Sequence, residues 1–137
     1  MRVFSPIVIN GMRLKNRFVR SATGEGLAHA DGSASDRLEA LLRTLAKGEV
    51  GLIVSSHAYV EKRGQARAGQ LGAHSPDMEA GLARLARVVH AYGGRFVVQL
   101  AHAGCRADLA VTGEGPIGPS APADPAADCR AMTAEDL

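Results

Sequence analysis

Two histidines, each near the predicted end of an apolar strand, are the strongest candidates for chemistry in this sequence. His57 follows the apolar run 50–55, and His102 follows the run 95–100. The carboxyl ends of parallel strands are where α/β proteins build their binding and catalytic sites. Gln99 lies in the second run, where a buried amide needs a hydrogen-bond partner. The partner is either a backbone group of a neighbouring loop or a ligand with both donors and acceptors, and the pattern leaves both open.

His102, Cys105 and Cys129 could together bind a metal, but their spacing is weak evidence for such a site. Zinc sites use three or four ligands at close spacing, and here a single His-x-x-Cys is followed by one distant cysteine. Two cysteines do not form a disulfide framework, and we expect free thiols in a reducing cytoplasm. Cys105 precedes Arg106 and could be a nucleophile, although an ordinary loop thiol is the expected state.

Two other patterns are predicted to carry no chemistry. Residues 113–118 match G-x-G-x-x-G, but the dinucleotide fingerprint needs a strand before it and a helix after it. Here a loop precedes the glycines and a proline-rich run follows them, so no dinucleotide site is predicted. The remaining histidines, His29, His74 and His90, are expected to be solvated surface residues.

Hydrophobic periodicity predicts the first elements that position these candidates. Asn10-Gly11 between two apolar runs predicts a hairpin over 3–14, because both turn residues need positive φ. Residues 16–22 form a short strand candidate. A helix follows, with Ser33 and Ser35 as possible N-caps and Gly48 as a left-handed C-cap. Its apolar face consists of Leu38, Leu41, Leu42 and Leu45, at helical spacing.

The next elements continue the alternation of strands and helices. Residues 50–55 are a continuous apolar run, typical of a strand that is buried on both faces. Ser75 as N-cap and Pro76 at the first helical position open a second helix. Its apolar face consists of Met78, Leu82, Leu85 and Val89, and residues 93–94 end it before the third strand at 95–100. Strand, helix, strand, helix, strand in this order predicts an α/β fold with a parallel sheet.

The last part of the sequence does not continue the alternation of strands and helices. Residues 103–132 are a long loop rich in Pro, Gly and Ala, which is typical of functional or disordered segments. Thr133 with Asp136 three residues later predicts the start of a third helix, in whose first turn the sequence stops. We therefore expect a truncated unit whose edge strand requires further strands.

Composition excludes several classes of protein. The 137 residues include 16 Lys and Arg against 14 Asp and Glu, a balance that argues against a dedicated nucleic-acid binder. Hydrophobic residues make up 46%, too many for a disordered chain. No apolar run reaches the 18 residues of a membrane span, and the N-terminus has no long apolar segment of a secretory signal. The prediction is a cytoplasmic protein without nucleic-acid or membrane partners.

Six motifs, in order and with compatible spacing, resemble the old yellow enzyme family of FMN-dependent NAD(P)H:flavin oxidoreductases and ene-reductases. They are Phe-Ser-Pro-Ile at 4–7, Leu-Lys-Asn-Arg-Phe-Val at 14–19, Val-Gly-Leu-Ile at 50–53, Gln-Leu-Ala-His-Ala-Gly at 99–104, Gly-Pro-Ser at 118–120 and Met-Thr-Ala-Glu-Asp-Leu at 132–137. The resemblance covers essentially the whole chain. It implies the N-terminal part of a (β/α)8 TIM barrel, with about three βα units, two of their helices complete, and an N-terminal hairpin.

The resemblance also implies a function. Such an enzyme passes hydride from NAD(P)H through FMN to a small-molecule substrate, an activated alkene or a similar electrophile. Ser21, Ala22 and Thr23 would lie along the flavin ring, largely through backbone groups. Gly24 matches a position where many members carry Cys or Thr, whose side chain tunes the flavin. His57 would touch the ring, and Gln99 would hydrogen-bond its pyrimidine edge.

The resemblance gives lesser roles to the other candidates and places part of the chemistry elsewhere. His102 would support the site, and Cys105 occupies a position where the commoner pattern has Arg. In this family the residues that activate the substrate, the proton-donating tyrosine and the FMN phosphate site lie beyond this segment, and neither Tyr59 nor Tyr92 matches the donor. The chain alone is therefore predicted to be inactive without the rest of its barrel or a homo-oligomer partner. The alternatives are a non-catalytic α/β module that binds a partner through its open edge, and the Cys/His metal module.

Overall fold

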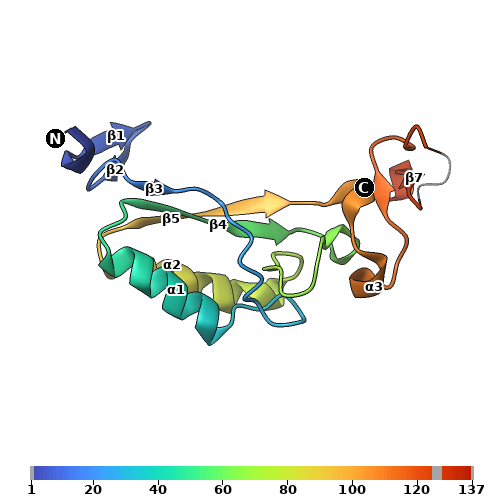
Figure 1. Cartoon of the computed structure of the whole chain (residues 1–137), viewed down its shortest axis with the longest axis horizontal. Helices are drawn as coiled ribbons and strands as arrows, with labels where there is room; N and C mark the ends of the chain where they lie inside the picture. The colour runs from blue at the N-terminus through green and yellow to red at the C-terminus, as the bar shows by residue number, and fades with distance from the viewer. Residues whose placement is uncertain (1, 125–127, 137) are drawn as a thin grey trace.

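A computed structural model describes residues 2–124 and 128–136. The chain begins with a 3₁₀ turn (Arg2–Phe4) and a hairpin of β1 (Ile7–Ile9) and β2 (Met12–Leu14). Asn10 and Gly11 connect the two strands with φ of 45° and 83°, which confirms the predicted two-residue turn. The hairpin lies at one end of the molecule (Figure 1).

A three-stranded parallel sheet forms the centre of the fold. Its strands are β3 (Val19–Arg20), β4 (Leu52–Tyr59) and β5 (Arg95–Ala101), in the order β3-β4-β5, as the alternation predicts. β3 is much shorter than the predicted 16–22. At its C-terminal end the Arg20 guanidinium donates to the carbonyl oxygen of Val54 at 3.0 Å, an acceptor that a longer ladder would use.

β4, in contrast, is longer than predicted. It begins and ends later than the predicted 50–55, so that His57 lies inside the strand and not beyond it. Its last residues find partners on both sides. Tyr59 N donates to Leu71 O at 3.0 Å and pairs with Gly72, while Ala58 lies in register with Leu100. These long-range partners extend the strand past its apolar run.

Helix α1 (Asp36–Lys47) begins and ends at two caps, of which sequence predicts the first correctly. Ser35 Oγ accepts from Leu38 N at 3.1 Å, while Ser33 bonds Asp31 and caps nothing. At the other end Gly48 has φ of −74°, and Glu49 takes the left-handed conformation with φ of 65°. The predicted left-handed Gly48 is therefore wrong by one residue.

Helix α2 (Glu79–His90) follows a 3₁₀ turn (Pro76–Met78). Pro76 opens that turn as predicted, but the Ser75 side chain makes no capping bond, because the helix proper begins only at Glu79. The buried residues of α2 are Leu85, Val88 and Val89. Val88 lies outside the predicted apolar face.

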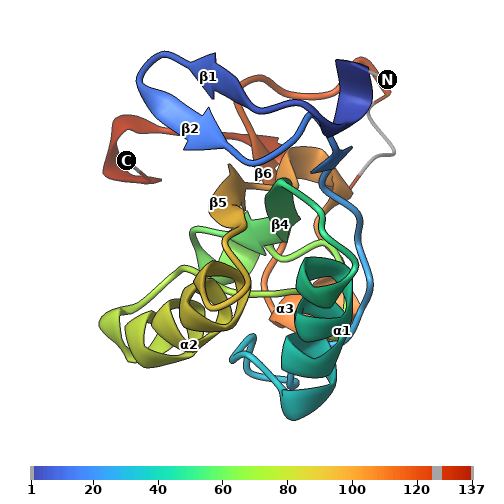
Figure 2. The same cartoon turned by 90° about the vertical axis from the view of Figure 1, so that its left-hand side faces the viewer.

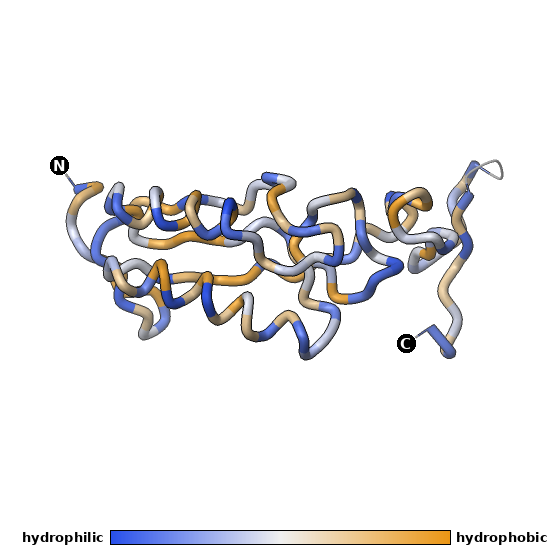
Figure 3. Tube along the Cα trace, turned by 90° about the horizontal axis from the view of Figure 1, so that it is seen from below, coloured by the Kyte–Doolittle hydropathy of each residue, from blue (hydrophilic) through white to orange (hydrophobic). Residues whose placement is uncertain are grey.

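Both helices cover the same face of the sheet, and the opposite face of β4 and β5 has no helix on it (Figures 1 and 2). Polar and apolar residues alternate along the helices (Figure 3). Their apolar stripes enclose the core between helices and sheet. That core consists of Ala34, Leu38, Leu42, Ala46, Ile53, Ala58, Leu71, Leu85, Val88 and Val89.

His74 belongs to the inner part of the structure, contrary to the prediction of a solvated side chain. Its ring stacks on Tyr59, with centroids 4.6 Å apart, and its Nδ1 is buried with no hydrogen-bond partner among the described residues. Tyr59 is buried, and its hydroxyl donates to Asp31 O at 3.0 Å. Burial raises the pKa of Tyr59, and the Asp31 carboxylate adds to that rise. His90 is exposed on α2 and His29 in its loop, as predicted.

The segment 103–132 carries structure of its own and is not one irregular loop. It contains a 3₁₀ turn (Gly104–Arg106), α3 (Leu109–Thr112) and the parallel pair β6 (Ile117–Gly118) and β7 (Arg130–Ala131). Gly113, with φ of 72°, ends α3, and Gly118, the last glycine of the motif, lies in β6, so the motif does not open a helix as a dinucleotide fingerprint would.

A disulfide joins Cys105 to Cys129, so the prediction of free thiols is wrong. The two cysteines are 24 residues apart, and the pairing of β6 with β7 brings their surroundings together. A Cβ on Gly118 would lie 2.6 Å from Cys105 Sγ and 3.7 Å from Cys129 Sγ. The missing side chain at Gly118 therefore leaves the space that the disulfide occupies.

The described chain ends in a single 3₁₀ turn (Ala134–Asp136). Asp136 Oδ2 accepts from Thr133 N at 2.8 Å and from Thr133 Oγ1 at 3.0 Å, which confirms a helical turn starting at Thr133. Another such turn (Lys62–Gly64) follows β4. No helix in the described part of the chain has the length and apolar character of a membrane span.

Candidate functional site

A β-bulge in β4 determines which side chains meet on the open face of the sheet. Val54 lies opposite Val97, and the next partners are His57 and Gln99, so β4 contains one residue more than β5 over this stretch. Side chains alternate between the two faces of a strand, so without the extra residue His57 would point to the helix side. The bulge places His57 beside Gln99 on the face that the helices leave free.

Ser55, one of the residues in the bulge, compensates for the interrupted ladder. Its Oγ accepts the backbone N–H of Gln99 at 3.1 Å and donates to Ser56 O at 2.5 Å. Both serines are buried. A buried backbone N–H without an acceptor is costly, so this hydroxyl allows the bulge to exist next to Gln99.

Gln99 is exposed, contrary to the prediction that its amide is buried. Its side chain makes no hydrogen bond to any residue that the structure describes. Both the carbonyl and the NH₂ of the amide are thus available to a molecule on the open face. Of the two partners that the sequence left open, the neighbouring backbone group is not used.

Gln70, which sequence reasoning missed, fixes the orientation of His57. Its Oε1 accepts from Ala66 N at 2.7 Å, and its Nε2 donates to His57 O at 3.2 Å and lies 2.7 Å from His57 Nδ1. With the amide held in this orientation, Nδ1 accepts and the ring proton lies on Nε2. Gln70 is only 3% exposed, although nothing in its sequence context distinguishes it from a surface glutamine.

Gly24 lies against His57 and an unpredicted third residue, Arg67. A Cβ on Gly24 would overlap Arg67 Nη2 and would lie 3.3 Å from His57 Nε2. Arg67 Nη2 donates to Gly24 O at 2.8 Å. The guanidinium therefore fills the space that a side chain at position 24 would occupy, and the charge of Arg67 is brought to the carboxyl ends of β3 and β4.

Ser21, Ala22 and Thr23 follow directly after the shortened β3 and lead the chain to Gly24. Ser21 and Thr23 are exposed, and Thr23 Oγ1 donates to Ser21 O at 3.3 Å. Arg20 and Glu25, on either side of this stretch, form an ion pair that is largely shielded from water. Of the six predicted residues, the structure thus gathers Gly24, His57 and Gln99 and places the other three on the adjoining segment.

A cavity of about 210 Å³ opens at the carboxyl ends of β4 and β5. Its lining consists of His57, Ala66, Gln70, Ala101, His102 and Ala103. His102 Nδ1 accepts from Gly104 N at 3.0 Å, so its Nε2 carries the proton and donates to Glu61 Oε2 at 3.0 Å. A Cβ on Gly64 would overlap the His102 ring. His102 is thus fixed by Glu61, Gly64 and Gly104 and forms part of the wall of the cavity.

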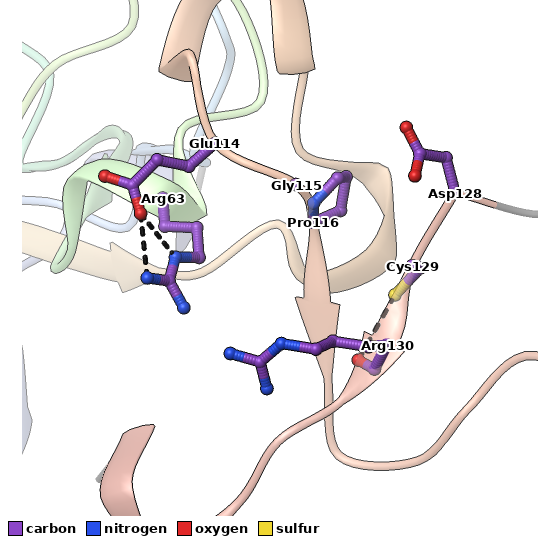
Figure 4. A pocket seen from close by; sticks show the side chains of 7 residues that line it. All are labelled: Arg63, Glu114, Gly115, Pro116, Asp128, Cys129 and Arg130. Carbon is purple, nitrogen blue, oxygen red and sulfur yellow. Dashed lines mark hydrogen bonds and ion pairs between the residues drawn. The ribbon is translucent and has the colours of Figure 1, made fainter.

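A larger cavity, of about 560 Å³, lies around β6 and β7 (Figure 4). Its lining consists of Arg63, Glu114, Gly115, Pro116, Asp128, Cys129 and Arg130. Arg63 pairs with Glu114 at 2.7 Å and with Asp136 at 3.1 Å, and Arg130 pairs with Asp136 at 2.7 Å. These ion pairs raise the pKa of Arg63 and of Arg130. The charges neutralise one another and attach the C-terminal segment to the 3₁₀ turn at 62–64.

The metal hypothesis is wrong for the described residues. Cys105 and Cys129 are bonded to each other, and His102 is bonded to Glu61 and Gly104. Residues 2–124 and 128–136 contain no group of three or more His, Cys, Asp or Glu side chains that could hold an ion.

A parallel sheet with helices on one face, and polar side chains gathered where its strands end, defines a segment of an α/β barrel. The model of the NADH:flavin oxidoreductase / NADH oxidase family matches residues 2–137, and the chain belongs to this family.

Similar proteins agree with this assignment. The chain is 30% identical to an NADH:fumarate oxidoreductase of Klebsiella pneumoniae over 99% of its own length and 15% of the relative. It is 35% identical to an NADPH dehydrogenase of Halalkalibacterium halodurans over 88% of its length and 35% of the relative. The chain thus spans about a third or less of these relatives.

The chain also superposes on part of several longer solved structures. A 2-naphthoyl-CoA reductase superposes with a TM-score of 0.90 at 29% identity, over 98% of this chain and 23% of that one. The old yellow enzyme of Pichia sp. AKU4542 superposes with a TM-score of 0.86 over 98% of this chain and 38% of that one, and at 22% identity this likeness concerns the fold. The predicted family and partial barrel are confirmed.

Proposed function

We propose that this chain is part of an FMN-dependent NAD(P)H oxidoreductase, and that the open face at the carboxyl ends of β3, β4 and β5 holds the flavin ring. One observation carries the proposal. The bulge in β4 places His57 beside Gln99 on the uncovered face, where the Gln99 amide has no partner within the described chain.

The residues on this face are suited to a flavin. Its pyrimidine edge offers acceptors and a donor, which the carboxamide of Gln99 complements with one NH₂ and one carbonyl. His57 would lie against the ring from the neighbouring strand, and Ser21, Ala22, Thr23 and Gly24 would supply backbone along the end of β3. Bound FMN supplies the hydride chemistry between NAD(P)H and substrate, while these residues hold and orient the ring.

We propose that the other strands of a barrel cover the exposed sheet face and pair with the edge strands of this chain. Val19 and Val97, on the uncovered face of the sheet, are 51% and 41% exposed, and β3 and β5 are edge strands in the described chain. Apolar side chains and unpaired strand edges of this kind are buried when a barrel closes. The substrate-activating groups would come from that remainder, so we expect no turnover from this segment alone.

The substrate class is proposed to be an activated alkene. The resemblance to the old yellow enzyme family implies this class, and one relative is named for fumarate, whose carbon–carbon double bond is conjugated to carboxyl groups. Reduction by hydride needs such an electron-poor double bond.

Gln99 provides the test. The protein at its natural length should bind FMN, seen as flavin absorbance that NADPH bleaches without oxygen. Gln99→Leu removes both hydrogen bonds and should weaken FMN binding about tenfold. Gln99→Glu keeps only acceptors and should bind with intermediate affinity. His90→Leu, a comparable change on exposed α2, is the control and should leave binding unchanged. Unchanged FMN affinity in Gln99→Leu would refute the assignment.

A further inference from the structure

Arg67 is exposed, yet the loop that carries it is firmly attached. The buried Gln65 donates its Nε2 to Arg67 O at 3.1 Å. Two residues further on, Gly69 O accepts from Ala28 N at 2.9 Å. Together with the bond from Arg67 Nη2 to Gly24 O, these contacts join the loop 65–70 to the segment 24–28. The fold thus fixes the backbone that carries Arg67, and the bond to Gly24 O holds its guanidinium beyond the end of β3.

The charge of Arg67 is not neutralised within the described chain. Arg63, Arg84 and Arg130 each pair with carboxylates at 2.7 Å to 3.1 Å, whereas no described carboxylate forms an ion pair with Arg67. A guanidinium carries five N–H donors, of which the bond to Gly24 O uses one. Donors remain for a ligand.

His57 Nε2 is a second hydrogen-bond donor that lies near the Arg67 guanidinium, beside Gly24. The place where a Cβ of Gly24 would lie is overlapped by Arg67 Nη2 and is 3.3 Å from His57 Nε2. Gln70 keeps the proton of His57 on Nε2, so this nitrogen donates. A cation and a neutral N–H therefore converge beside the small cavity that His57 lines.

We propose that Arg67 and His57 form a binding site for a carboxylate group of the substrate, in which the guanidinium occupies the space that the absence of a side chain at Gly24 leaves free. A carboxylate has two acceptor oxygens, one for the planar guanidinium and one for the imidazole N–H, and charge-assisted bonds of this kind are among the strongest. The inference rests on the proposed function, because it narrows the substrate to one with an anionic end. Gly24 is essential to the site because its missing side chain leaves room for the guanidinium.

Acetate is the probe for the test, titrated into the FMN-free protein at its natural length and followed by calorimetry and by the NMR signals of the His57 ring. We expect one acetate per chain. Arg67→Ala should weaken acetate binding about tenfold to a hundredfold, as expected for the loss of a charged hydrogen bond. Arg87→Ala, which removes an equal charge from the exposed side of α2, should leave the affinity unchanged.

Gly24→Ala tests the position of the Arg67 guanidinium while leaving its charge unchanged. The added methyl group takes the space of Nη2, and because the guanidinium is the end of a flexible side chain, it moves away while the fold is kept. Acetate affinity should then fall as in Arg67→Ala, although every charge is retained. Equal affinity in Gly24→Ala and the wild type, or an equal loss in Arg67→Ala and Arg87→Ala, would overturn the inference.

FMN binding is measured separately in the same proteins, so the two proposals can fail independently. Bound FMN without any acetate binding refutes the carboxylate site and leaves the flavin site standing. Acetate binding that depends on Arg67 and Gly24 supports the carboxylate site even where FMN does not bind.

Discussion

Ser55 and Gln99 are joined across two strands by a bond from the Gln99 backbone N–H to the Ser55 hydroxyl, at 3.1 Å. The bond spans the bulge that separates the Val54–Val97 pair from the His57–Gln99 pair. A single buried hydroxyl thus repairs the ladder where its regular pattern is interrupted. The bulge determines which side chains lie on the face that the helices leave free, because without it His57 would point to the helices.

Replacing Ser55 with alanine should therefore disturb both stability and ligand binding. Ser55→Ala leaves the Gln99 N–H without its acceptor, which costs about 1–3 kcal/mol of the free energy of unfolding. It should also weaken FMN binding, because the strand can relieve the loss by changing register at His57. Urea denaturation and FMN titration measure the two effects.

Ser56→Ala is the matched control for this prediction. Ser56 is also buried, but its side chain makes no hydrogen bond in the described part of the chain, and only its backbone carbonyl accepts from Ser55. We expect a smaller change in stability and unchanged FMN affinity. Equal losses in both variants would show that the hydroxyl of Ser55 has no special part in holding the bulge.

Local signals explain why the fold could be predicted from sequence. Asn10-Gly11, the Ser35 cap and the apolar runs of β4 and β5 act over a few residues, and each marks an element that the structure contains, although the bounds of β4 are shifted. The boundaries that were wrong depend on distant partners. β3 ends early, where the Arg20 guanidinium donates to the Val54 carbonyl oxygen.

The candidate site was predictable only in part, for the same reason. His57 and Gln99 were identified by their place near strand ends, but the bulge that aligns them leaves no mark on the apolar pattern of 50–55. Gln70 and Arg67 act through contacts 13 and 43 residues away along the chain. Both residues lie in a loop rich in polar residues, where the sequence does not show which side chains are buried.

The Cys105–Cys129 disulfide should stabilise the segment between its ends. The loop it closes, with a sequence separation of 24, corresponds to about 3–4 kcal/mol in the chain-entropy account of disulfides. Cys105→Ser should lower the free energy of unfolding by up to this amount, and intact mass should rise by about 2 Da on reduction of the wild type. A mass that is unchanged by reductant, with denaturation equal in Cys105→Ser and wild type, would contradict the pairing.

Asp136 predicts an unusual pH dependence at the C-terminal turn. The Arg130 guanidinium, and then the Thr133 backbone N–H, hold the pKa of Asp136 far below its usual range. A carboxyl with a lowered folded pKa contributes stability above its unfolded pKa of about 4 and loses it as pH falls through the folded value. The turn should therefore persist below pH 4, where ordinary carboxyls become protonated. The carboxyl ¹³C shift of Asp136, read against pH, should show no midpoint near 4, and Arg130→Ala should raise the midpoint towards 4.

Gln70 should control the tautomer of His57, and ¹⁵N NMR can show it directly. In the wild type we expect an unprotonated Nδ1 and a protonated Nε2, because Gln70 Nε2 is 2.7 Å from Nδ1 while Ala66 N holds the amide in place. Gln70→Leu removes this donor and should give a mixture of the two tautomers. Since Nε2–H is the group that His57 presents beside Gly24, the same change should weaken acetate binding several-fold with Arg67 intact. A wild-type spectrum with the proton on Nδ1 would show that Gln70 does not orient the ring, and His57 would then be an acceptor with no affinity for a carboxylate.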